Sequence, residues 1–300
     1  MNRQSYKTHR AFTLVELLMV VIIITMLAAL SLTASNFAVK ASKEAKTRVT
    51  IQKLDTAMRR IYEEYADKFE SILAQSNYND GANLTPEQKA KLKLHLIHDL
   101  MRLELPDRSA DITTDPQHYE TFALNARPPI TDYYNATADN PELLFQIIQN
   151  LSPETISEFK GSEIGDTNGN GLYEFLDAWG HPIRFIRHAP ALPQSDLQPN
   201  VWKIADKTPV RSHWDALTNE DFDKIRAQYP YPLDPDKLAE KSWFLYPVIY
   251  SAGPDRHYDL SVNEDAPNGD QSVVPFNVPN GLPVGNGYFD NISNHRLSGY

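Results

Sequence analysis

The sequence predicts an α+β protein in which one long N-terminal helix precedes a region of short elements and turns. Of the 12 glycines, only Gly81 comes before residue 161, and all 21 prolines lie at Pro86 or later. Both residue types break helix interiors, so the N-terminal quarter can form one continuous helix. No charged residue occurs from Leu17 to Val39. As a helix this stretch is roughly 34 Å long at about 1.5 Å per residue, enough to cross a bilayer.

Composition excludes several classes of protein. The chain of 300 residues has no cysteine, which rules out a disulfide scaffold, thiolate metal sites and a cysteine nucleophile. A hydrophobic fraction of 41% with 23% charged residues argues against wholesale disorder. The formal charge of −10 and the lack of a long basic run indicate that nucleic acid is not a main partner.

The first residues read as a basic leader before an apolar segment. Arg3, Lys7 and Arg10 are accompanied by no acid, which favours a cytoplasmic N-terminus with the rest of the chain outside. Glu16 lies at the start of the apolar run, where a carboxylate is costly and needs a partner. A cleaved secretory signal peptide ending near Ala34 is the alternative, but it gives no reason for Glu16.

Residues 11–22, Ala-Phe-Thr-Leu-Val-Glu-Leu-Leu-Met-Val-Val-Ile, closely resemble the prepilin motif of type IV pilins and type II secretion pseudopilins. The resemblance implies that a prepilin peptidase cuts between Ala11 and Phe12 and that Phe12 is then methylated. It also implies that Glu16 pairs with the N-terminal amine of a neighbouring subunit during assembly. The family usually has glycine where this chain has Ala11.

The resemblance further implies a pilin-like fold, with the long helix packed on a small antiparallel sheet. We expect a structural subunit rather than an enzyme, assembled into a type II secretion pseudopilus or a type IV pilus-like filament. Its partners would be prepilin peptidase, other pilin or pseudopilin subunits and membrane lipid. It would span the bacterial inner membrane once, with its C-terminal domain in the periplasm or on a surface filament.

The alternative function is a membrane-tethered periplasmic binding module or hydrolase. It would use acidic residues such as Asp166, Glu174 and Asp177 on a periplasmic substrate. Such a site needs carboxylates gathered in a pocket with shifted pKa values. The sequence shows scattered acids instead.

The chain divides by pattern into a leader (1–11), a membrane-spanning half-helix (12–39), an amphipathic half-helix (40–76), a helical and irregular insertion (77–160) and a sheet and loop region (161–300). The amphipathic half-helix shows apolar residues at three- to five-residue steps, a stripe that we expect to pack under the chain's own globular domain. Its members are Val49, Ile51, Leu54, Met58, Ile61, Tyr62, Tyr65, Phe69 and Ile72.

Shorter helices follow. Pro86 comes after Thr85, a good N-cap, and begins a predicted second helix that runs to Glu104. Residues 106–140 are rich in Pro, Asp and Thr and are predicted to be irregular. Residues 141–150 and 153–159 are predicted as short helices.

A first candidate calcium loop begins at Asp166. Counted from Asp166 as position 1, Asn168 is at 3, Asn170 at 5 and Asp177 at 12, with Gly171 at the turn. This spacing matches the template in which hard oxygens surround a hard cation, so calcium is a predicted cofactor. An ordinary polar turn before a strand is an equally good interpretation.

Two C-terminal segments look like parts of the major type II pseudopilin. Residues 177–186, Asp-Ala-Trp-Gly-His-Pro-Ile-Arg-Phe-Ile, resemble the segment that opens its sheet and are predicted to enter a strand. Residues 246–255 resemble its strand that ends in a Tyr-Ser-x-Gly-x-Asp turn and leads into a calcium-binding loop. The resemblance makes Ser251 and Asp255 candidate metal residues, with a solvated acidic loop as the alternative.

Overall fold

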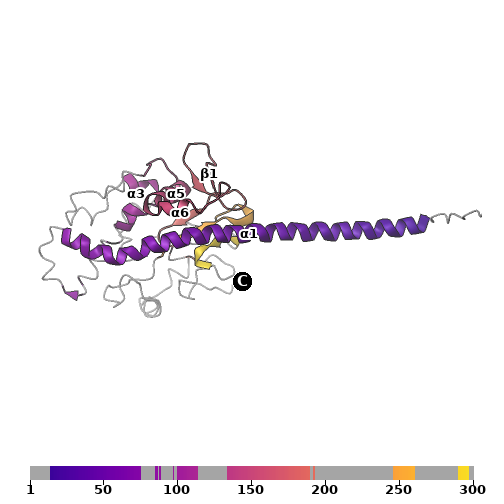
Figure 1. Cartoon of the computed structure of the whole chain (residues 1–300), viewed down its shortest axis with the longest axis horizontal. Helices are drawn as coiled ribbons and strands as arrows, with labels where there is room; N and C mark the ends of the chain where they lie inside the picture. Colours follow the sequence, from indigo (N-terminus) through magenta and orange to yellow (C-terminus); the bar gives the residue numbers. More distant parts are fainter. Residues whose placement is uncertain are drawn as a thin grey trace, which may run out of the picture. The chain divides into compact units, whose positions relative to one another are not determined.

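The computed structural model describes residues 14–75, 85, 86, 88, 97, 100–113, 134–189, 192, 246–260 and 290–296. Ala11 and Phe12 lie outside these residues. The chain forms two compact units, Met1–Lys43 and Glu44–Tyr300. The described elements are one long helix, several short helices and small antiparallel sheets (Figure 1). The α+β class with a long N-terminal helix is therefore confirmed.

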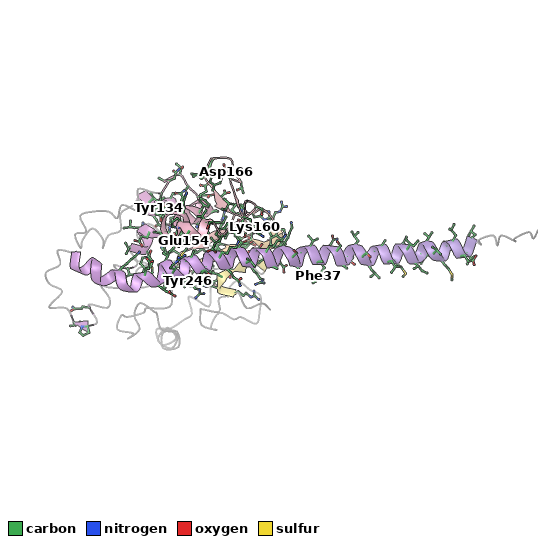
Figure 2. All side chains as sticks on the ribbon, in the orientation of Figure 1. Phe37, Tyr134, Glu154, Lys160, Asp166 and Tyr246 are labelled. Carbon is green, nitrogen blue, oxygen red and sulfur yellow. The ribbon has the colours of Figure 1, made fainter. Side chains whose placement is uncertain are left out.

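Helix α1 runs from Leu14 to Gln75. It contains neither glycine nor proline, which explains why no break occurs over its 62 residues. In the first unit, the large apolar side chains from Leu14 to Val39 are all exposed, and they surround the ribbon on every side (Figure 2). A helix that is apolar all round belongs in a membrane or in the core of an assembly.

From Glu44 onward, α1 buries one face in the second unit. Most of the predicted stripe is buried there. Val49 is the exception, since half of its surface (50%) is exposed, and Thr47 and Thr50 occupy the buried face instead. Both threonines find partners: Thr50 Oγ1 donates to Glu163 Oε1, and Thr47 Oγ1 accepts from the backbone N–H of Ala178. Phe69 and Ile72 are members of the stripe whose side chains lie outside the described residues.

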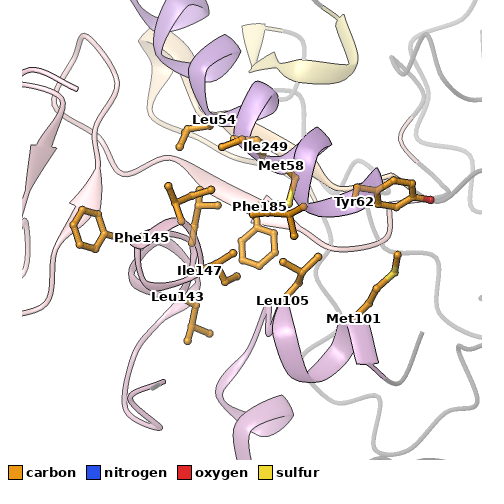
Figure 3. Packing of buried hydrophobic residues seen from close by; sticks show 14 of the residues in the cluster. Leu54, Met58, Tyr62, Met101, Leu105, Leu143, Phe145, Ile147, Phe185 and Ile249 are labelled. Atoms are coloured by element: carbon orange, nitrogen blue, oxygen red, sulfur yellow. The ribbon is translucent and has the colours of Figure 1, made fainter. Parts of the chain in front are cut away.

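The main core lies between α1, helix α5 and the sheet (Figure 3). Leu54 and Met58 of α1 belong to the same cluster as Phe185 and Ile249 of the sheet. Every described residue of the predicted helix from Pro86 to Glu104 is helical, and Met101 and other apolar side chains of its C-terminal end join this core. The short helix α3 (Ser109–Thr113) follows within the segment predicted to be irregular.

Helix α5 (Asn140–Leu151) confirms the helix predicted at 141–150. It begins with a capping box, in which the Asp139 side chain accepts from the Glu142 N–H and the Glu142 side chain accepts from the Asp139 N–H. The predicted helix at 153–159 was too long: α6 covers only Pro153–Ile156. Residues 157–159 form turns, which Ser157 begins by bonding back to the Glu154 carbonyl.

Two small sheets are present in the described residues. Strands β1 (Ile164–Gly165) and β2 (Glu174–Phe175) pair antiparallel on either side of the loop that begins at Asp166. The second sheet has the order β3-β4-β5, all antiparallel. Its members are β3 (Arg184–Ile186), β4 (Val248–Ser251) and β5 (Ile292–Ser293). The two predicted strands are thus β3 and β4, and β2 is the strand that the polar-turn interpretation expects after the Asp166 loop. Strands β1 and β5 were not predicted.

The outer side of β3 is closed by a side chain rather than by another strand. The Asn140 amide donates to the Phe185 carbonyl (2.7 Å) and accepts from the Phe185 N–H (3.0 Å). Two residues after Phe185 in the chain, the Arg187 N–H donates to the Asp107 carboxylate. The backbone groups that a further strand would need are therefore already bonded.

Candidate functional site

The first candidate functional segment is the apolar N-terminal part of α1, which could span a membrane. Among the described residues, one helix is long and apolar enough to cross a membrane, and it begins at Leu14. Glu16 lies in its first turn. Thr25 Oγ1 donates to the Ile22 carbonyl and Thr33 Oγ1 to the Leu30 carbonyl, both at 2.9 Å. These hydroxyls are satisfied within the helix, as an apolar surrounding requires.

The loop after β1 is organised by Asp166. Its carboxylate accepts the backbone N–H groups of Gly169, Asn170 and Gly171, at 2.7 to 3.2 Å. Gly169 and Gly171 have φ values of +75° and +88°, which glycine adopts without strain. The structure therefore brings Asp166, Asn168 and Asn170 together in one tight turn.

Beneath this turn lies a cluster of three carboxylates, from Asp139, Glu142 and Glu174, with oxygens within 4.8 Å of one another. Glu142 and Glu174 are 0% and 1% exposed. The Asn168 and Asn170 amides donate to Glu142 Oε1 at 2.9 and 2.6 Å. We call these three acids the acidic cluster.

Burial and mutual repulsion act on the acidic cluster. Asp139 is exposed at the surface, yet partial desolvation of its carboxyl, followed by the charge of Glu142, raises its pKa. Burial also raises the pKa of Glu174, and the charges of Asp139 and Glu142 add to that effect, although Thr167 donates two hydrogen bonds to its carboxylate. A hard cation at this place would relieve the repulsion, since carboxylates are its usual ligands.

Asp177 has a different place from the one that the loop count predicted. It is 3% exposed, and its Oδ1 accepts the N–H groups of Trp179 (2.8 Å) and His181 (2.9 Å). Its Oδ2 accepts from Ser251 Oγ at 2.7 Å, and Ser251 Oγ in turn accepts the Gly253 N–H. Asp177 and Ser251 therefore join the two segments that lead into β3 and out of β4.

Asp255 lies in the turn after β4, apart from both the Asp166 turn and the Asp177–Ser251 pair. Its Oδ1 accepts the His257 N–H at 2.8 Å, and its side chain is partly open to solvent. The six candidate metal residues thus fall into three groups: the Asp166 turn, the Asp177–Ser251 pair and Asp255. No described contact joins one group to another.

Sequence reasoning missed the acidic cluster as a unit. Glu174 was considered only as an acid of the alternative hydrolase, and Asp139 and Glu142 were not singled out. The sequence did contain a signal for part of the cluster. Asp139 is followed three residues later by Glu142 and then by an apolar run, which is a pattern typical of a helix start. The pattern places Glu142 at the start of α5, but only the fold brings it to Glu174.

A hard cation fits the Asp166 turn because further oxygens gather there. Asp166 and Asp177 each accept from three protein donors, but the Asp166 turn also lies against the acidic cluster, to which the Asn168 and Asn170 amides donate at Glu142. Calcium remains a prediction. Its residues would be Asp166, Asn168 and Asn170, with the acidic cluster below them.

Calcium titration of the full chain in detergent micelles tests this prediction. We expect binding that is weak, with a Kd of about 10⁻⁴ to 10⁻³ M as in extracellular modules, because Asp166 is the one charged ligand that the turn itself supplies. Asp166→Asn should weaken it at least tenfold, and Glu158→Gln, which alters an exposed acid elsewhere, should not. Absence of a calorimetric signal at millimolar calcium would leave the loop as a plain turn.

Comparison with known proteins identifies the N-terminal segment. The family described as "Prokaryotic N-terminal methylation motif" matches residues 6–32. A search of curated proteins and of solved structures returned no match. The matched residues include Ala11, Phe12 and Glu16, and they support a pilin-like protein that a prepilin peptidase processes.

Proposed function

We propose that this chain is a membrane-anchored pilin-like subunit that assembles into a type II secretion pseudopilus or a type IV pilus-like filament. The N-terminal methylation motif at residues 6–32 carries the proposal. It overlaps the start of a helix whose large apolar side chains are exposed from Leu14 to Val39. Such a surface is stable only when lipid or other apolar helices cover it.

The two coverings correspond to two states of the subunit. Before assembly, the segment spans the inner membrane once, and the basic leader with Arg3, Lys7 and Arg10 keeps the N-terminus in the cytoplasm. The domain beyond Val39 then lies on the outer side. After assembly, the same side chains pack against those of neighbouring subunits.

Apolar contacts alone do not fix how one subunit is positioned against the next, and Glu16 supplies a specific contact between subunits. Removal of the leader creates a new amine at Phe12, four residues before Glu16 in the chain. An ammonium group in a neighbouring copy is a suitable partner for a carboxylate at membrane depth, because the pair spares both charges the cost of standing alone in hydrocarbon. The pairing also fixes the axial offset between adjacent subunits.

The globular unit supports the pseudopilus form of the proposal. The segments 177–186 and 246–255, which resemble the major type II pseudopilin, contain β3 and β4, and these strands pair antiparallel. The Asp177–Ser251 hydrogen bond links the same two segments. The two segments that carry the resemblance are thus adjacent in one sheet.

Mass spectrometry of the mature N-terminus tests the proposal. We expect protein from bacterial membranes that contain a prepilin peptidase to begin with N-methylated Phe12. Ala11→Gly should be processed equally well, because both residues are small, and a bulky Ala11→Leu should accumulate as precursor. A mature chain that begins near Ser35, or one that retains Met1 in those cells, would refute the proposal.

A further inference from the structure

The C-terminal segment of the second unit is attached to α1 by a small set of buried polar contacts. Residues 290–296, which contain β5 and the turn η7 (Asn294–Arg296), lie beside α1 (Figure 1, yellow). Asn294 Nδ2 donates to Asp55 Oδ1 at 2.8 Å. Arg48 Nη1 donates to the Arg296 carbonyl at 3.3 Å. We call residues 290–296 the C-terminal clasp.

Asp55 is the centre of these contacts on α1. Its side chain is buried, and it accepts from three groups: Asn294, the Tyr246 hydroxyl (3.0 Å) and Arg59 Nε (2.7 Å). Asn294 also bonds to β4 and the residue before it, since its Oδ1 accepts the Ile249 N–H and its Nδ2 donates to the Pro247 carbonyl. A single side chain therefore ties the clasp to both the helix and the sheet.

His295 is enclosed at the same place. It is 2% exposed, its Nε2 lies 3.2 Å from the Pro247 carbonyl, and its ring stacks on Tyr246 with a centroid distance of 5.9 Å. The backbone of Tyr246 is a second hydrogen-bond partner, and both backbone contacts favour the charged ring. The neutral imidazole carries one proton, and acid adds a second one to its other nitrogen. A charge here would be buried against the aromatic ring.

The charges around His295 work in opposite directions. On α1, Asp55 favours a charged imidazole and Arg59 disfavours it. Arg48 of the same helix reaches the end of the clasp, and Arg296 belongs to the clasp itself. Tyr246, which stacks on His295, donates its hydroxyl to Asp55, and the Arg59 guanidinium lies over its ring. Burial outweighs the favourable contacts and lowers the pKa of His295 to about 4.

We propose that residues 290–296 form an acid-sensitive clasp, which holds the C-terminal segment on α1 and β4 at neutral pH and detaches when His295 is protonated. This goes beyond the filament role and does not depend on it. Only two residue pairs, Tyr250–Ser293 and Ser251–Ile292, join the clasp to β4 as a strand. The side-chain bonds from the clasp to α1 and β4 run mainly through Asn294, which is next to His295, so a disruption at this point can open the segment locally.

The size of the effect follows from linkage. The neutral imidazole stabilises the closed state above the unfolded pKa of 6.5, and this contribution is lost as the pH falls toward about 4. At pH 4.5 the opening equilibrium should have risen roughly 50- to 100-fold relative to neutral pH.

Hydrogen–deuterium exchange of the full chain in detergent micelles, followed by mass spectrometry at pH 7.5 and 4.5, tests the clasp. After correction for the pH dependence of intrinsic exchange, peptides covering 290–296 should lose protection by that factor. In β4 the Ile249 amide, which donates to Asn294, should follow, whereas the amides that pair with β3 should stay protected. Helix α5 should keep its protection. Equal protection of the clasp at both pH values, or an equal loss in α5, would overturn the proposal.

Two substitutions sharpen the test. In His295→Gln the amide can still donate to the Pro247 carbonyl but does not titrate, so the clasp should stay protected at pH 4.5. His257→Gln, at an exposed histidine, should behave like the wild type. An equal acid-dependent loss in His295→Gln would assign the opening to another group. If that variant does not fold, His295→Phe, which keeps a ring beside Tyr246 and likewise does not titrate, takes its place.

Discussion

Replacement of Glu16 by alanine should abolish incorporation of the chain into filaments while leaving it in the membrane. The apolar helix that begins at Leu14 is unchanged by the substitution, so membrane insertion is retained or improved. What is lost is the charge that would neutralise the terminal amine of a neighbouring subunit. Filaments sheared from cells and quantified by immunoblot should contain less than about a hundredth of the wild-type level, the result of losing roughly 3 kcal/mol per contact.

Two controls separate assembly from processing and folding. Glu64→Ala removes an exposed acid from the same helix within the second unit and should leave incorporation unchanged. The Glu16→Ala protein should still show the mature N-terminus by mass spectrometry, because the cleavage site is intact. Wild-type incorporation of Glu16→Ala would contradict the assigned role.

Replacement of Arg187 by methionine should cost about 3–5 kcal/mol of the free energy of unfolding. Arg187 is almost completely buried, with Nη1 2.9 Å from Asp111 Oδ2 and 2.9 Å from the Leu105 carbonyl. Burial alone would raise the pKa of Asp107, but Arg187 and Arg108 hold it below its ordinary value. Without Arg187, two buried carboxylates would lose their main counter-charge.

Guanidinium unfolding of the full chain in micelles, monitored by tryptophan fluorescence, measures this loss. Arg60→Met is the matched control, because Arg60 pairs with Glu154 where both side chains are more than half exposed. Exposed ion pairs contribute less than about 1 kcal/mol. Equal losses in the two variants would show that the buried position of Arg187 has no special importance.

Local patterns predicted those parts of the fold that depend on neighbouring residues. The absence of glycine and proline predicted α1, and the apolar steps predicted Leu54, Met58 and Tyr65 in the core. Val49 was misassigned because its spacing fits a helical stripe almost as well as that of Thr50. The buried face took Thr50 instead, since Glu163, more than a hundred residues away, supplies a partner for its hydroxyl.

The arrangement of the candidate site could not be read from spacing. Counting along the loop placed Asp177 beside Asp166, whereas its carboxylate bonds to Ser251, 74 residues further on. The acidic cluster likewise forms only when the start of α5 meets β2. Sequence spacing describes a single turn well, but it does not tell which distant strand or helix start will supply the next ligand.

The Asn140 amide on β3 has a consequence for the assembly that we propose. Where copies of the chain gather in a membrane, an open strand edge would allow the domains to pair edge to edge and aggregate. Because the Asn140 side chain already bonds to the N–H and C=O of Phe185, edge-to-edge pairing with another strand is prevented at β3. In the proposed filament, contact between subunits would then be left to their apolar N-terminal helices.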